Sequence, residues 1–447
     1  MSERRNRQSD QPAPPVRPLV RALLLSFGVL VVALFFLIGI LSVTRDTPVN
    51  SVRTLDGGRL PSLTDSLFQR TMQMYTGLGL HEGNIVEPLA NGNGTYPIFW
   101  ADLRSARRTL TAQFYFSQPG AVADTLSAIL IERRRAGVRV LLLLDAFGSR
   151  PLKGDWVEHL RDAGVEVAWL RPLHWYTLHK ADERSHVRAI IVDGRVGYTG
   201  GFGLADYWLG DGRHENQWRE ANVRVQGPAV ARLQAAFAEG WAEATGQLLV
   251  GDDFFPPTAF EPVGAVRAGV LHTAPTVGST SAERFLALTI VGSRKRLFIS
   301  NAYFVPGDEF SRLLVDAAGR GVDVRVLTAG PRTDVKTTRY ASRYRYEQLL
   351  TGGVRIFEYQ PTNIHAKTIV ADGVWSAIGS MNFDNRSLAF NNELMLTSLD
   401  SVVGARMDSV FMADLPFAHE IRLVEFRRRA WRERLLEWGA NLVWRVL

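Results

Sequence analysis

The longest apolar stretch of the chain runs from Ala22 to Val43 and contains no charged residue. As a helix it would be about 33 Å long, and the hydrocarbon core of a bilayer is about 30 Å thick. Arginines precede or open the stretch at positions 4, 5, 7, 17 and 21. We therefore predict a disordered basic tail over residues 1–17 and a transmembrane helix over residues 18–44.

The arginine bias also predicts the orientation of this helix. Because arginines favour the cytoplasmic side, the N-terminus is expected in the cytoplasm. The rest of the chain then lies on the outer (periplasmic or extracytoplasmic) side of the cell membrane, after a single crossing. A cleaved signal peptide is the alternative, but the apolar run is long for one and no A-x-A cleavage site follows it.

Beyond this stretch, helical and strand patterns alternate. Residues 45–90 are weakly periodic and predict a linker with a short helix over residues 63–75. Two helices and three strands are predicted next, the helices over residues 98–106 and 125–136 and the strands over residues 110–116, 137–144 and 165–170. This alternation is typical of an α/β sandwich.

The same order of segments occurs twice in the chain. Gly137-Val138 and its flanking residues match Gly321-Val322, and Val192-Asp193-Gly194 matches Ala371-Asp372-Gly373. The distance along the chain between the matching segments is far longer than the repeat length of a solenoid. We therefore predict two tandem α/β/α sandwich halves in a pseudo-twofold arrangement, over residues 91–245 and 263–415, joined by a linker over residues 246–262.

Composition narrows the class of protein. Of the 447 residues, 46% are hydrophobic and 22% are charged, which excludes a disordered chain. The net charge of +7 favours anionic partners such as phospholipid headgroups or nucleic acid, without choosing between them. The chain has no cysteine, which excludes disulfides and thiolate metal sites.

The clearest candidate chemistry lies in the second half. His365, Lys367 and Asp372 form the pattern H-x-K-x4-D, and the residues between them predict a buried strand. In a strand, His365 and Lys367 point to the same face. An imidazole beside a cation suits a nucleophile or proton carrier that acts on a phosphate. Ser380 and Asn382 follow a glycine turn and offer further donors to phosphate oxygens.

This segment, together with Phe383–Ser387 and Asn392-Glu393, resembles the HKD motif of the phospholipase D superfamily, in the version found in bacterial cardiolipin synthases. The resemblance covers roughly residues 91–417. It implies a two-step transfer without a metal or other cofactor. One histidine attacks phosphorus and becomes a phosphohistidine, while the other protonates the leaving alkoxide and later deprotonates the acceptor.

The first half contains a degenerate form of the motif. His186, Arg188 and Asp193 stand 179 residues before their counterparts, but arginine replaces lysine. Arginine keeps the positive charge, although its guanidinium is bulkier and does not release a proton. Gly203 stands where the motif has asparagine. The sequence therefore predicts the fold of this half and leaves its catalytic competence open.

The resemblance implies a role for each matching side chain. The phosphate oxygens would be held by Lys367, Arg188, Ser380 and Asn382. Glu393 would orient His365 and Glu220 would orient His186, by accepting a hydrogen bond from the second ring nitrogen. Asp193 and Asp372, the last members of the two motifs, are expected to brace the structure.

Two questions about this site stay open from the sequence. Either histidine fits the role of nucleophile, and the intact second motif favours His365. Whether the acceptor is an alcohol or water is not determined by the motifs.

The last segment, residues 416–447, predicts a basic amphipathic tail. Trp431, Leu435, Trp438 and Leu442 are spaced four, three and four residues apart, which places them on one helical face. Tryptophan combined with arginine suits a membrane interface. A helix that packs on the globular body is the alternative.

The expected protein is a membrane-anchored enzyme that joins two phosphatidylglycerols into cardiolipin and releases glycerol. A phospholipase D that hydrolyses phospholipids to phosphatidic acid is one alternative, and a non-catalytic lipid-binding protein is another. A nuclease is disfavoured because the sequence shows no stacking surface for nucleic acid, so no nucleic-acid partner is expected. Headgroup choice and oligomeric state are left open.

Overall fold

The computed structural model describes residues 18–43, 48–55, 57–172, 183–276 and 278–446. The chain divides into two units, residues 1–45 and 46–447. In the first unit, α1 spans Pro18–Val43, whereas the tail predicted over residues 1–17 lies outside the described residues. Among the described residues, no helix meets both the length and the apolar character that a membrane crossing requires. The transmembrane helix therefore stays a prediction.

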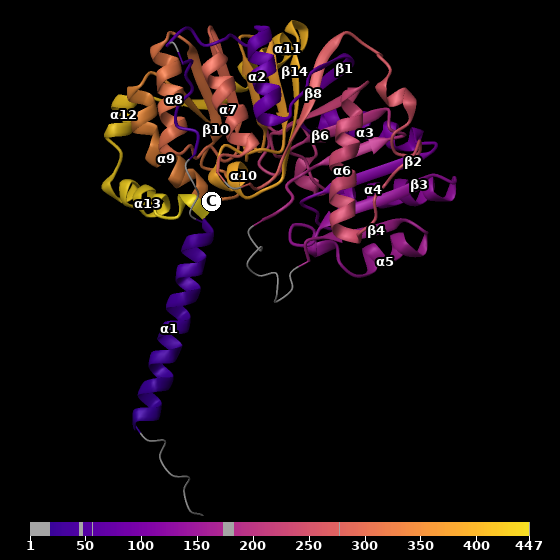
Figure 1. Cartoon of the computed structure of the whole chain (residues 1–447), viewed down its shortest axis with the longest axis horizontal. Helices are drawn as coiled ribbons and strands as arrows, with labels where there is room; N and C mark the ends of the chain where they lie inside the picture. The colour runs from indigo at the N-terminus through magenta and orange to yellow at the C-terminus, as the bar shows by residue number, and fades with distance from the viewer. Residues whose placement is uncertain (1–17, 44–47, 56, 173–182, 277, 447) are drawn as a thin grey trace, which may run out of the picture. The chain divides into compact units, whose positions relative to one another are not determined.

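The second unit begins with α2 (Ser66–Thr76) and then contains two series of strands and helices (Figure 1). The first series consists of β1 (His81–Ala90), α3 (Asn91–Ser105), β2 (Thr109–Phe114), α4 (Ala121–Arg135), β3 (Arg139–Asp145), α5 (Asp155–Asp162), β4 (Glu166–Leu170), β5 (Ala189–Val192), β6 (Val196–Gly200), β7 (Ala221–Gln226) and α6 (Ala229–Thr245).

The second series repeats this order and adds a C-terminal extension. It consists of β8 (Val266–Thr273), α7 (Ser281–Gly292), β9 (Arg296–Asn301), α8 (Asp308–Gly319), β10 (Asp323–Ala329), α9 (Lys336–Thr351), β11 (Arg355–Tyr359), β12 (Lys367–Ala371), β13 (Trp375–Gly379), α10 (Asn385–Ala389), β14 (Glu393–Leu399) and α11 (Ser401–Asp414). The extension contains β15 (Ala418–Ile421), α12 (Leu423–Arg427) and α13 (Trp431–Asn441).

In the described residues the strands form one fifteen-stranded sheet, in the order β15-β11-β10-β9-β12-β13-β14-β8-β1-β7-β6-β5-β2-β3-β4. The halves join where β1 runs antiparallel to β8. Read outward from this seam, β1-β7-β6-β5-β2-β3-β4 has the same order as β8-β14-β13-β12-β9-β10-β11. The predicted mixed α/β fold is confirmed, and its two halves have matching topology.

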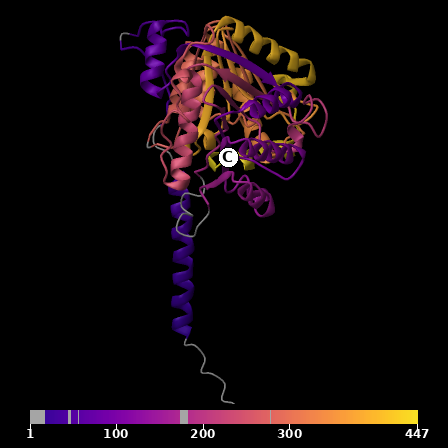
Figure 2. The same ribbon diagram turned by 90° about the vertical axis from the view of Figure 1, so that its right-hand side faces the viewer.

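Three large hydrophobic cores of described residues hold this unit together, with strands in the middle and helices outside them (Figure 1 and Figure 2). One core lies within each half. The third is shared, because Phe237 of α6 and Phe411 of α11 belong to one cluster with strand residues of both halves. Burial of this shared apolar surface stabilises the halves against each other, which fixes the geometry of any site between them.

The predicted linker over residues 45–90 is wrong in its last part. Residues His81–Ala90 are β1, which pairs with both β7 and β8 at the centre of the sheet. The sequence pattern did not indicate this strand, because it contains Gly83, Pro88 and four polar or charged residues, and glycine and proline are rare in central strands. Earlier in the same range, Phe68 and Met72 of α2 are buried in the core of the second half.

Two other boundaries differ from the prediction. Residues 91–94, where the first half was expected to begin, form the first turn of α3, and a Cβ on Gly92 would lie 2.2 Å from the carbonyl oxygen of Trp208. Residues 416–447 are not a separate tail, because β15 pairs with β11 and α13 packs against α9. Between the halves, residues 246–262 contain one short 3-10 helix, Pro257–Phe260.

Candidate active site

A cavity of about 320 Å³ lies between the two halves. It is lined by Tyr115, Phe116, His186, Arg188, Tyr207, Trp208, Trp218, Tyr303, Asp334, Val335, Thr338, His365, Asn382, Asp384, Arg386, Ser387 and Asn391. The histidines of the two motifs, 179 residues apart in the sequence, therefore meet at one cavity. This convergence is what the duplicated motif predicts.

Each histidine lies just before a strand of its own half and is attached by a backbone hydrogen bond to the other half. The backbone N–H of His186, ahead of β5, donates to the carbonyl of Asn392 at 2.9 Å. The backbone N–H of His365, ahead of β12, donates to the carbonyl of Arg219 at 2.7 Å. Both acceptors immediately precede a glutamate. These bonds therefore place each imidazole beside a glutamate of the opposite half.

The imidazoles and the glutamates form two pairs that cross between the halves. Nδ1 of His186 lies 2.9 Å from Oε2 of Glu393, and Nδ1 of His365 lies 2.7 Å from Oε2 of Glu220. The expected pairing within each half is therefore wrong. The crossed bridges Ser185–Asn392 and Arg219–Ile364 are the physical reason, because they set the register between the two halves.

Both glutamates are fully buried, and neither is among the described residues that line the cavity. Glu393 accepts hydrogen bonds from Oγ of Ser380 at 2.5 Å and Nδ2 of Asn391 at 3.3 Å. Glu220 accepts from Nε1 of Trp208 at 3.0 Å and from the backbone N–H of Ala221 at 2.9 Å. Ser380 was expected to hold a phosphate oxygen, but its hydroxyl donates to Glu393 instead. Ser380 and the two glutamates therefore support the histidines from behind.

The cations of the two motifs occupy equivalent positions. Nζ of Lys367 donates to the carbonyl of His365 at 2.6 Å, and Nη1 of Arg188 donates to the carbonyl of His186 at 2.5 Å. Nε of Arg188 also donates to the carbonyl of Phe202 at 3.2 Å. Both cations are buried, and Arg188 lines the cavity. The arginine of the first half thus keeps a positive charge where the second half has its lysine.

The glycines of the degenerate motif make room for a tryptophan. At Gly203 a Cβ would lie 2.6 Å from the carbonyl oxygen of Phe116 and 2.8 Å from the ring of Trp208. At Gly201 a Cβ would lie 2.5 Å from Oε1 of Glu220. The indole N–H of Trp208 then makes the hydrogen bond to Glu220 that Ser380 makes to Glu393. The first half thus keeps the hydrogen bond to its glutamate but uses a different donor side chain.

Restoring the missing asparagine is therefore expected to damage the protein. Gly203→Asn should lower the free energy of unfolding by about 1–3 kcal/mol, because the new side chain overpacks against Trp208. Thermal unfolding of the detergent-solubilised protein measures the change. The matched control is Gly246→Asn, where φ is +73°, no atom lies near a new Cβ, and asparagine tolerates the left-handed conformation. Equal stability of the two variants would contradict the expectation.

Asn382 is the remaining polar side chain that the motif placed in the site. It lines the cavity, and its Oδ1 is buried with no hydrogen-bond partner among the described residues. Buried polar atoms are nearly always satisfied, so an orphan at the cavity wall fits a ligand contact. Asn382 therefore remains the candidate donor or acceptor for substrate.

The two motif aspartates act on the backbone and not in the cavity. Oδ1 of Asp193 accepts from the backbone N–H of Arg108 at 2.8 Å, and Oδ1 of Asp372 accepts from that of Lys295 at 2.7 Å. Neither aspartate is among the described residues that line the cavity. Their grouping with the catalytic residues is corrected, and the bracing role expected for them fits the structure.

Several aromatic residues of the cavity lie outside the two histidine motifs. Tyr115 packs edge-on against the imidazole of His186, with ring centres 4.8 Å apart, and Trp218 lies 5.3 Å from the ring of His365. Tyr303 donates to Oδ2 of Asp334 at 2.6 Å. These aromatic side chains reduce the space for water around the histidines. In the described part of the chain, no group of three or more His, Asp or Glu side chains could hold a metal ion.

Burial and charge shift the pKa values of the site in different directions. Burial, helped by Arg188, holds the pKa of His186 well below its ordinary range, and burial with Lys367 lowers the pKa of His365. Burial also lowers the pKa of Lys367 to about 7 and raises that of Glu393 to about 8.

The second glutamate behaves differently. Burial acts to raise the pKa of Glu220, but the neighbouring His365 and Lys367 outweigh it, so this pKa is lowered. Near neutral pH, Glu220 is ionised whereas Glu393 holds a proton. The His186–Glu393 pair therefore carries one more proton than the His365–Glu220 pair.

The raised pKa of Glu393 predicts a pH dependence of stability. The folded pKa of about 8 is above the value of about 4.3 in an unfolded chain. The native state therefore holds the extra proton between these values, and its contribution to stability is lost as pH rises from about 4.3 to about 8. Glu393→Gln removes this titration, so its melting temperature should rise relative to wild type between pH 5 and pH 8.

Thermal melts of the two proteins at pH 5, 6.5 and 8 test this expectation. The control is Glu82→Gln, at an exposed position outside the cavity, for which the difference from wild type should stay constant. A constant difference for Glu393→Gln as well would contradict the prediction.

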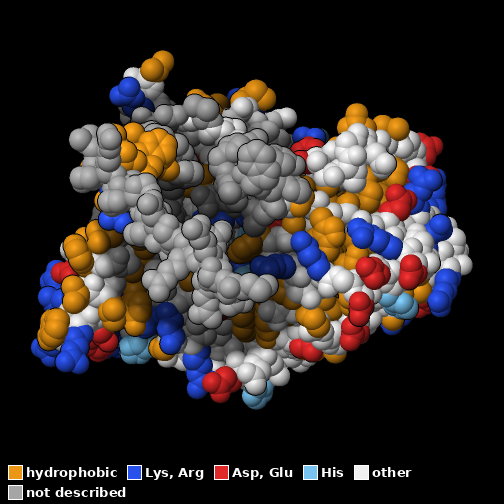
Figure 3. All heavy atoms as spheres, turned by 90° about the horizontal axis from the view of Figure 1, so that it is seen from below, with side chains coloured by type: hydrophobic (Ala, Val, Ile, Leu, Met, Phe, Trp, Pro, Cys, Tyr) orange, Lys and Arg blue, Asp and Glu red, His pale blue; other side chains and the backbone are white. Residues whose placement is uncertain are grey.

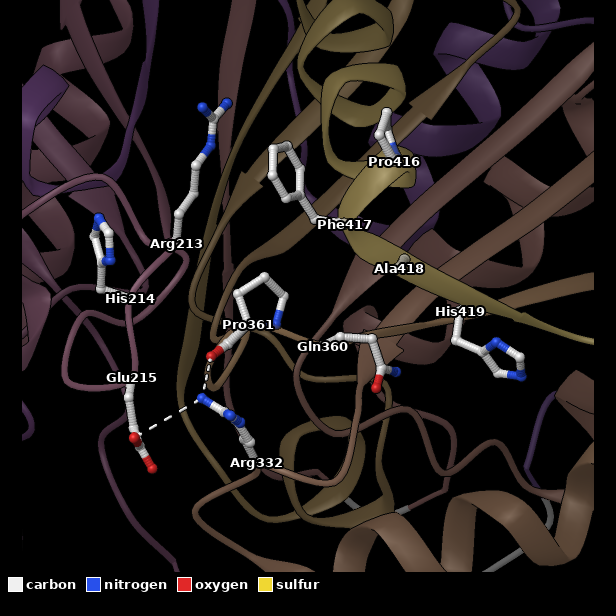
Figure 4. Close-up of a pocket in the computed structure, with 10 residues that line it drawn as sticks. All are labelled: Arg213, His214, Glu215, Arg332, Gln360, Pro361, Pro416, Phe417, Ala418 and His419. Carbon is white, nitrogen blue, oxygen red and sulfur yellow. Dashed lines mark hydrogen bonds and ion pairs between the residues drawn. The ribbon is translucent and has the colours of Figure 1, made fainter.

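A second, open hollow of about 680 Å³ lies at the seam between the halves (Figure 4). It is lined by Arg213, His214, Glu215, Arg332, Gln360, Pro361, Pro416, Phe417, Ala418 and His419. Arg332 reaches the carboxylate of Glu215 at 3.9 Å and the carbonyl of Pro361 at 3.0 Å. The guanidinium of Arg213 lies 4.5 Å from the ring centre of Phe417. Protein groups already engage both arginines, so the cavity with the histidines is the stronger candidate site.

Each of the two matching halves brings a histidine to one cavity, with the buried cation of its motif beside it. This arrangement defines a phospholipase D-like enzyme. Comparison with known proteins identifies the family within this class. The family model described as "Cardiolipin synthase, PLD-like domain" matches residues 286–415. Cardiolipin synthase A of Pseudomonas syringae pv. syringae (strain B728a) is 33% identical over 346 residues, which are 76% of this chain and 71% of that protein.

Cardiolipin synthase of Geobacillus kaustophilus (strain HTA426) is 32% identical over 358 residues, covering 79% of this chain and 71% of the relative. The chain therefore belongs to the cardiolipin synthase family of the phospholipase D superfamily. Among solved structures, phosphatidylserine synthase from Haemophilus influenzae Rd KW20 has a TM-score of 0.64 at 12% identity. That match covers 86% of this chain and all of that one, and it shows the shared fold.

Proposed function

We propose that this enzyme transfers a phosphatidyl group from one phosphatidylglycerol to another, giving cardiolipin and glycerol. The observation that carries the proposal is the crossed arrangement at the cavity, where each imidazole is backed by a buried glutamate of the other half. Two such imidazoles on one phosphate supply a nucleophile and a proton carrier. The substrate class is supported by the names of the relatives.

In the first step, His365 attacks phosphorus. Its Nδ1–H donates to the ionised carboxylate of Glu220, so Nε2 keeps the lone pair that forms the phosphorus–nitrogen bond. The bond from phosphorus to the glycerol oxygen breaks at the same time. The His186–Glu393 pair holds the additional proton and delivers it to the departing alkoxide from Nε2 of His186.

In the second step, a hydroxyl of the second phosphatidylglycerol replaces the departed glycerol. His186 removes its proton, the oxygen attacks phosphorus, and the bond to His365 breaks. Arg188 and Lys367 stabilise the charge that develops on the phosphate oxygens in both steps. A bound phosphate anion also favours the protonated form of Lys367, which burial alone disfavours.

Transfer to an alcohol is favoured over hydrolysis by the lining of the cavity. Tyr115, Trp208, Trp218 and Tyr303 pack around the histidines and give the cavity an aromatic wall. An aromatic wall also accepts the apolar parts of a lipid headgroup region.

Labelled phosphatidylglycerol incubated with the detergent-solubilised protein tests the proposed reaction. Cardiolipin and glycerol should form in equal amounts. Phosphatidic acid as the main product would support the hydrolase alternative and contradict the proposal. Cleavage of DNA without action on lipid would point to a nuclease, and an inert protein would support lipid binding without catalysis.

We also propose that residues 18–44 anchor the enzyme in the cell membrane, with the N-terminus in the cytoplasm and the second unit outside. The charge-free run from Ala22 to Val43 and the arginines before it support this topology. Protease added to intact spheroplasts should digest residues 46–447. Protection until the cells are lysed would contradict the orientation.

A further inference from the structure

The C-terminal helix α13 packs on the body through a charged side chain. Glu437, on the side that faces α9, is 1% exposed and accepts hydrogen bonds from Nε of Arg343 at 3.1 Å and Nε of Arg429 at 2.8 Å. Ala440, one turn further along, is the other buried residue of this helix. The helix is therefore held by ion pairs and one small side chain.

The apolar stripe of α13 points away from the body. Trp431 is 68% exposed, Leu435 55%, Trp438 52% and Leu442 65%. A helix on a globular protein normally buries its apolar face and exposes its charges, and here the two are reversed. Large exposed apolar patches mark interaction surfaces. The stripe is thus built to contact something outside the described part of the chain.

Arginines surround the stripe. Residues 422–447 contain seven arginines and three glutamates. The exposed arginines of this segment are Arg422, Arg427, Arg428, Arg432, Arg434 and Arg445. Figure 3 shows hydrophobic and basic side chains lying next to one another at the left of the face that it views. Tryptophan at the headgroup level, with arginine reaching anionic headgroups, is the chemistry of a helix lying in a bilayer interface.

The same segment borders the candidate active site. Nδ2 of Asn385 donates to the carbonyl of Arg445, and the next two residues of α10, Arg386 and Ser387, line the cavity. On the other side, α13 packs against α9, whose first turn contributes Thr338 to the cavity wall. A surface touching the stripe is therefore next to the cavity.

We propose that α13 and residues 442–445, together called the α13 surface, dock onto an anionic bilayer and hold the catalytic cavity at the level of the headgroups. A lipid would then reach the histidines directly from the bilayer surface. Docking of a second copy of this chain on the stripe is disfavoured, because symmetric pairing would bring the two arginine-rich rims together. The delivery of substrate rests on the proposed function, whereas the docking itself does not.

The absence of cysteine from the sequence allows a direct test. A single cysteine replaces Leu435 in the full chain, and Val402 on α11, which is 76% exposed, provides the matched control. Each cysteine carries an environment-sensitive fluorophore, and the proteins are reconstituted into vesicles of phosphatidylcholine with or without about one third phosphatidylglycerol. Iodide quenching should fall about fivefold at position 435 in the anionic vesicles and stay unchanged at position 402.

Equal quenching at positions 435 and 402 in anionic vesicles would overturn the proposal. Protection at position 435 that is already present in detergent and increases with protein concentration would also overturn it, in favour of contact between copies. If position 435 is protected but the wild type does not act on phosphatidylglycerol, the docking stands and the proposed function fails.

A kinetic measurement connects docking with catalysis. The double variant Leu435→Ser and Trp438→Ser should lose about tenfold in turnover on phosphatidylglycerol vesicles. It should match wild type on a short-chain, monomeric phosphatidylglycerol, which needs no bilayer. Val402→Ser is the control and should match wild type on both substrates. An unchanged vesicle rate in the double variant would contradict the role in substrate delivery, and loss on both substrates would indicate general damage to the enzyme.

Discussion

His365→Ala is expected to lower the turnover of phosphatidyl transfer by about four orders of magnitude, because it removes the proposed nucleophile. In wild type, Nδ1 of His365 is held 2.7 Å from Glu220, which orients the imidazole toward the phosphate. The alanine side chain has no nitrogen that could take its place. Steady-state transfer between labelled phosphatidylglycerols measures the loss. Trapping of the radiolabelled phosphoenzyme after a quench with denaturing detergent at alkaline pH, where a phosphorus–nitrogen bond survives, should succeed in wild type and fail in this variant.

The chain offers a matched control for this substitution. His272 also lies beside a glutamate, with Nδ1 3.1 Å from Oε2 of Glu239, and this pair is not among the described residues that line the cavity. His272→Ala should therefore keep its turnover within about twofold. Full phosphoenzyme formation in His365→Ala would show that the nucleophile has been assigned to the wrong histidine.

The second large effect concerns the crossed glutamates. Glu220→Gln and Glu393→Gln should each lower turnover by about two to three orders of magnitude. Glu220→Gln removes the negative charge that stabilises His365 as it bonds to phosphorus, and Glu393→Gln removes the proton that His186 delivers to the leaving group. The two variants should differ when the leaving group changes. A nitrophenyl phosphodiester releases a stable anion that needs no proton.

With this substrate, phosphoenzyme formation should recover in Glu393→Gln, as it should in His186→Ala, because only the proton donor is impaired. It should stay slow in Glu220→Gln, as in His365→Ala. Rapid-quench measurement of the phosphoenzyme separates the two groups. If Glu220→Gln instead recovered together with His186→Ala, the crossed assignment of glutamates to catalytic roles would be contradicted.

The motif and the duplication were sufficient to predict which histidines share the cavity. The strands β2, β3 and β4 are short segments rich in apolar residues between helical patterns, so the pattern placed them within a few residues of their observed limits. Once both halves have the same strand order, corresponding strand ends come together. His186 and His365 lie at such ends, which is why their meeting followed from the sequence.

The pairing of glutamates with histidines did not follow from the sequence. Two equivalent glutamates and two equivalent histidines permit pairing within or between the halves, and no periodicity distinguishes the two. Only the bridges at Ser185–Asn392 and Arg219–Ile364 decide it. Trp208 was missed for a related reason, because its hydrogen bond to Glu220 depends on two glycines that the motif reads as losses.

The sequence pattern was also insufficient to predict elements that mix apolar and polar residues. Because of Gly83 and Pro88, the sequence pattern did not indicate the central strand β1. This strand is stabilised by pairing with strands on both sides and not by the β-propensity of its residues. For α13, the spacing of Trp431, Leu435, Trp438 and Leu442 predicted one helical face. The sequence left open whether this face lies at a membrane interface or packs on the body, because the buried ion pairs of Glu437, which hold the opposite side of the helix, come from residues far apart in the chain.

The exchange of glutamates between the halves has a consequence for how such an enzyme can change over time. A single half on its own would have a histidine without its partner glutamate. Two identical halves would supply each other's glutamates, but the two histidines on either side of the phosphate would then be chemically equivalent. Joining the copies into one polypeptide removes that equality. The first half can then carry Arg188 and Trp208 while the second keeps Lys367 and Ser380, so that a substitution made in one half alters the acidity of a histidine encoded in the other.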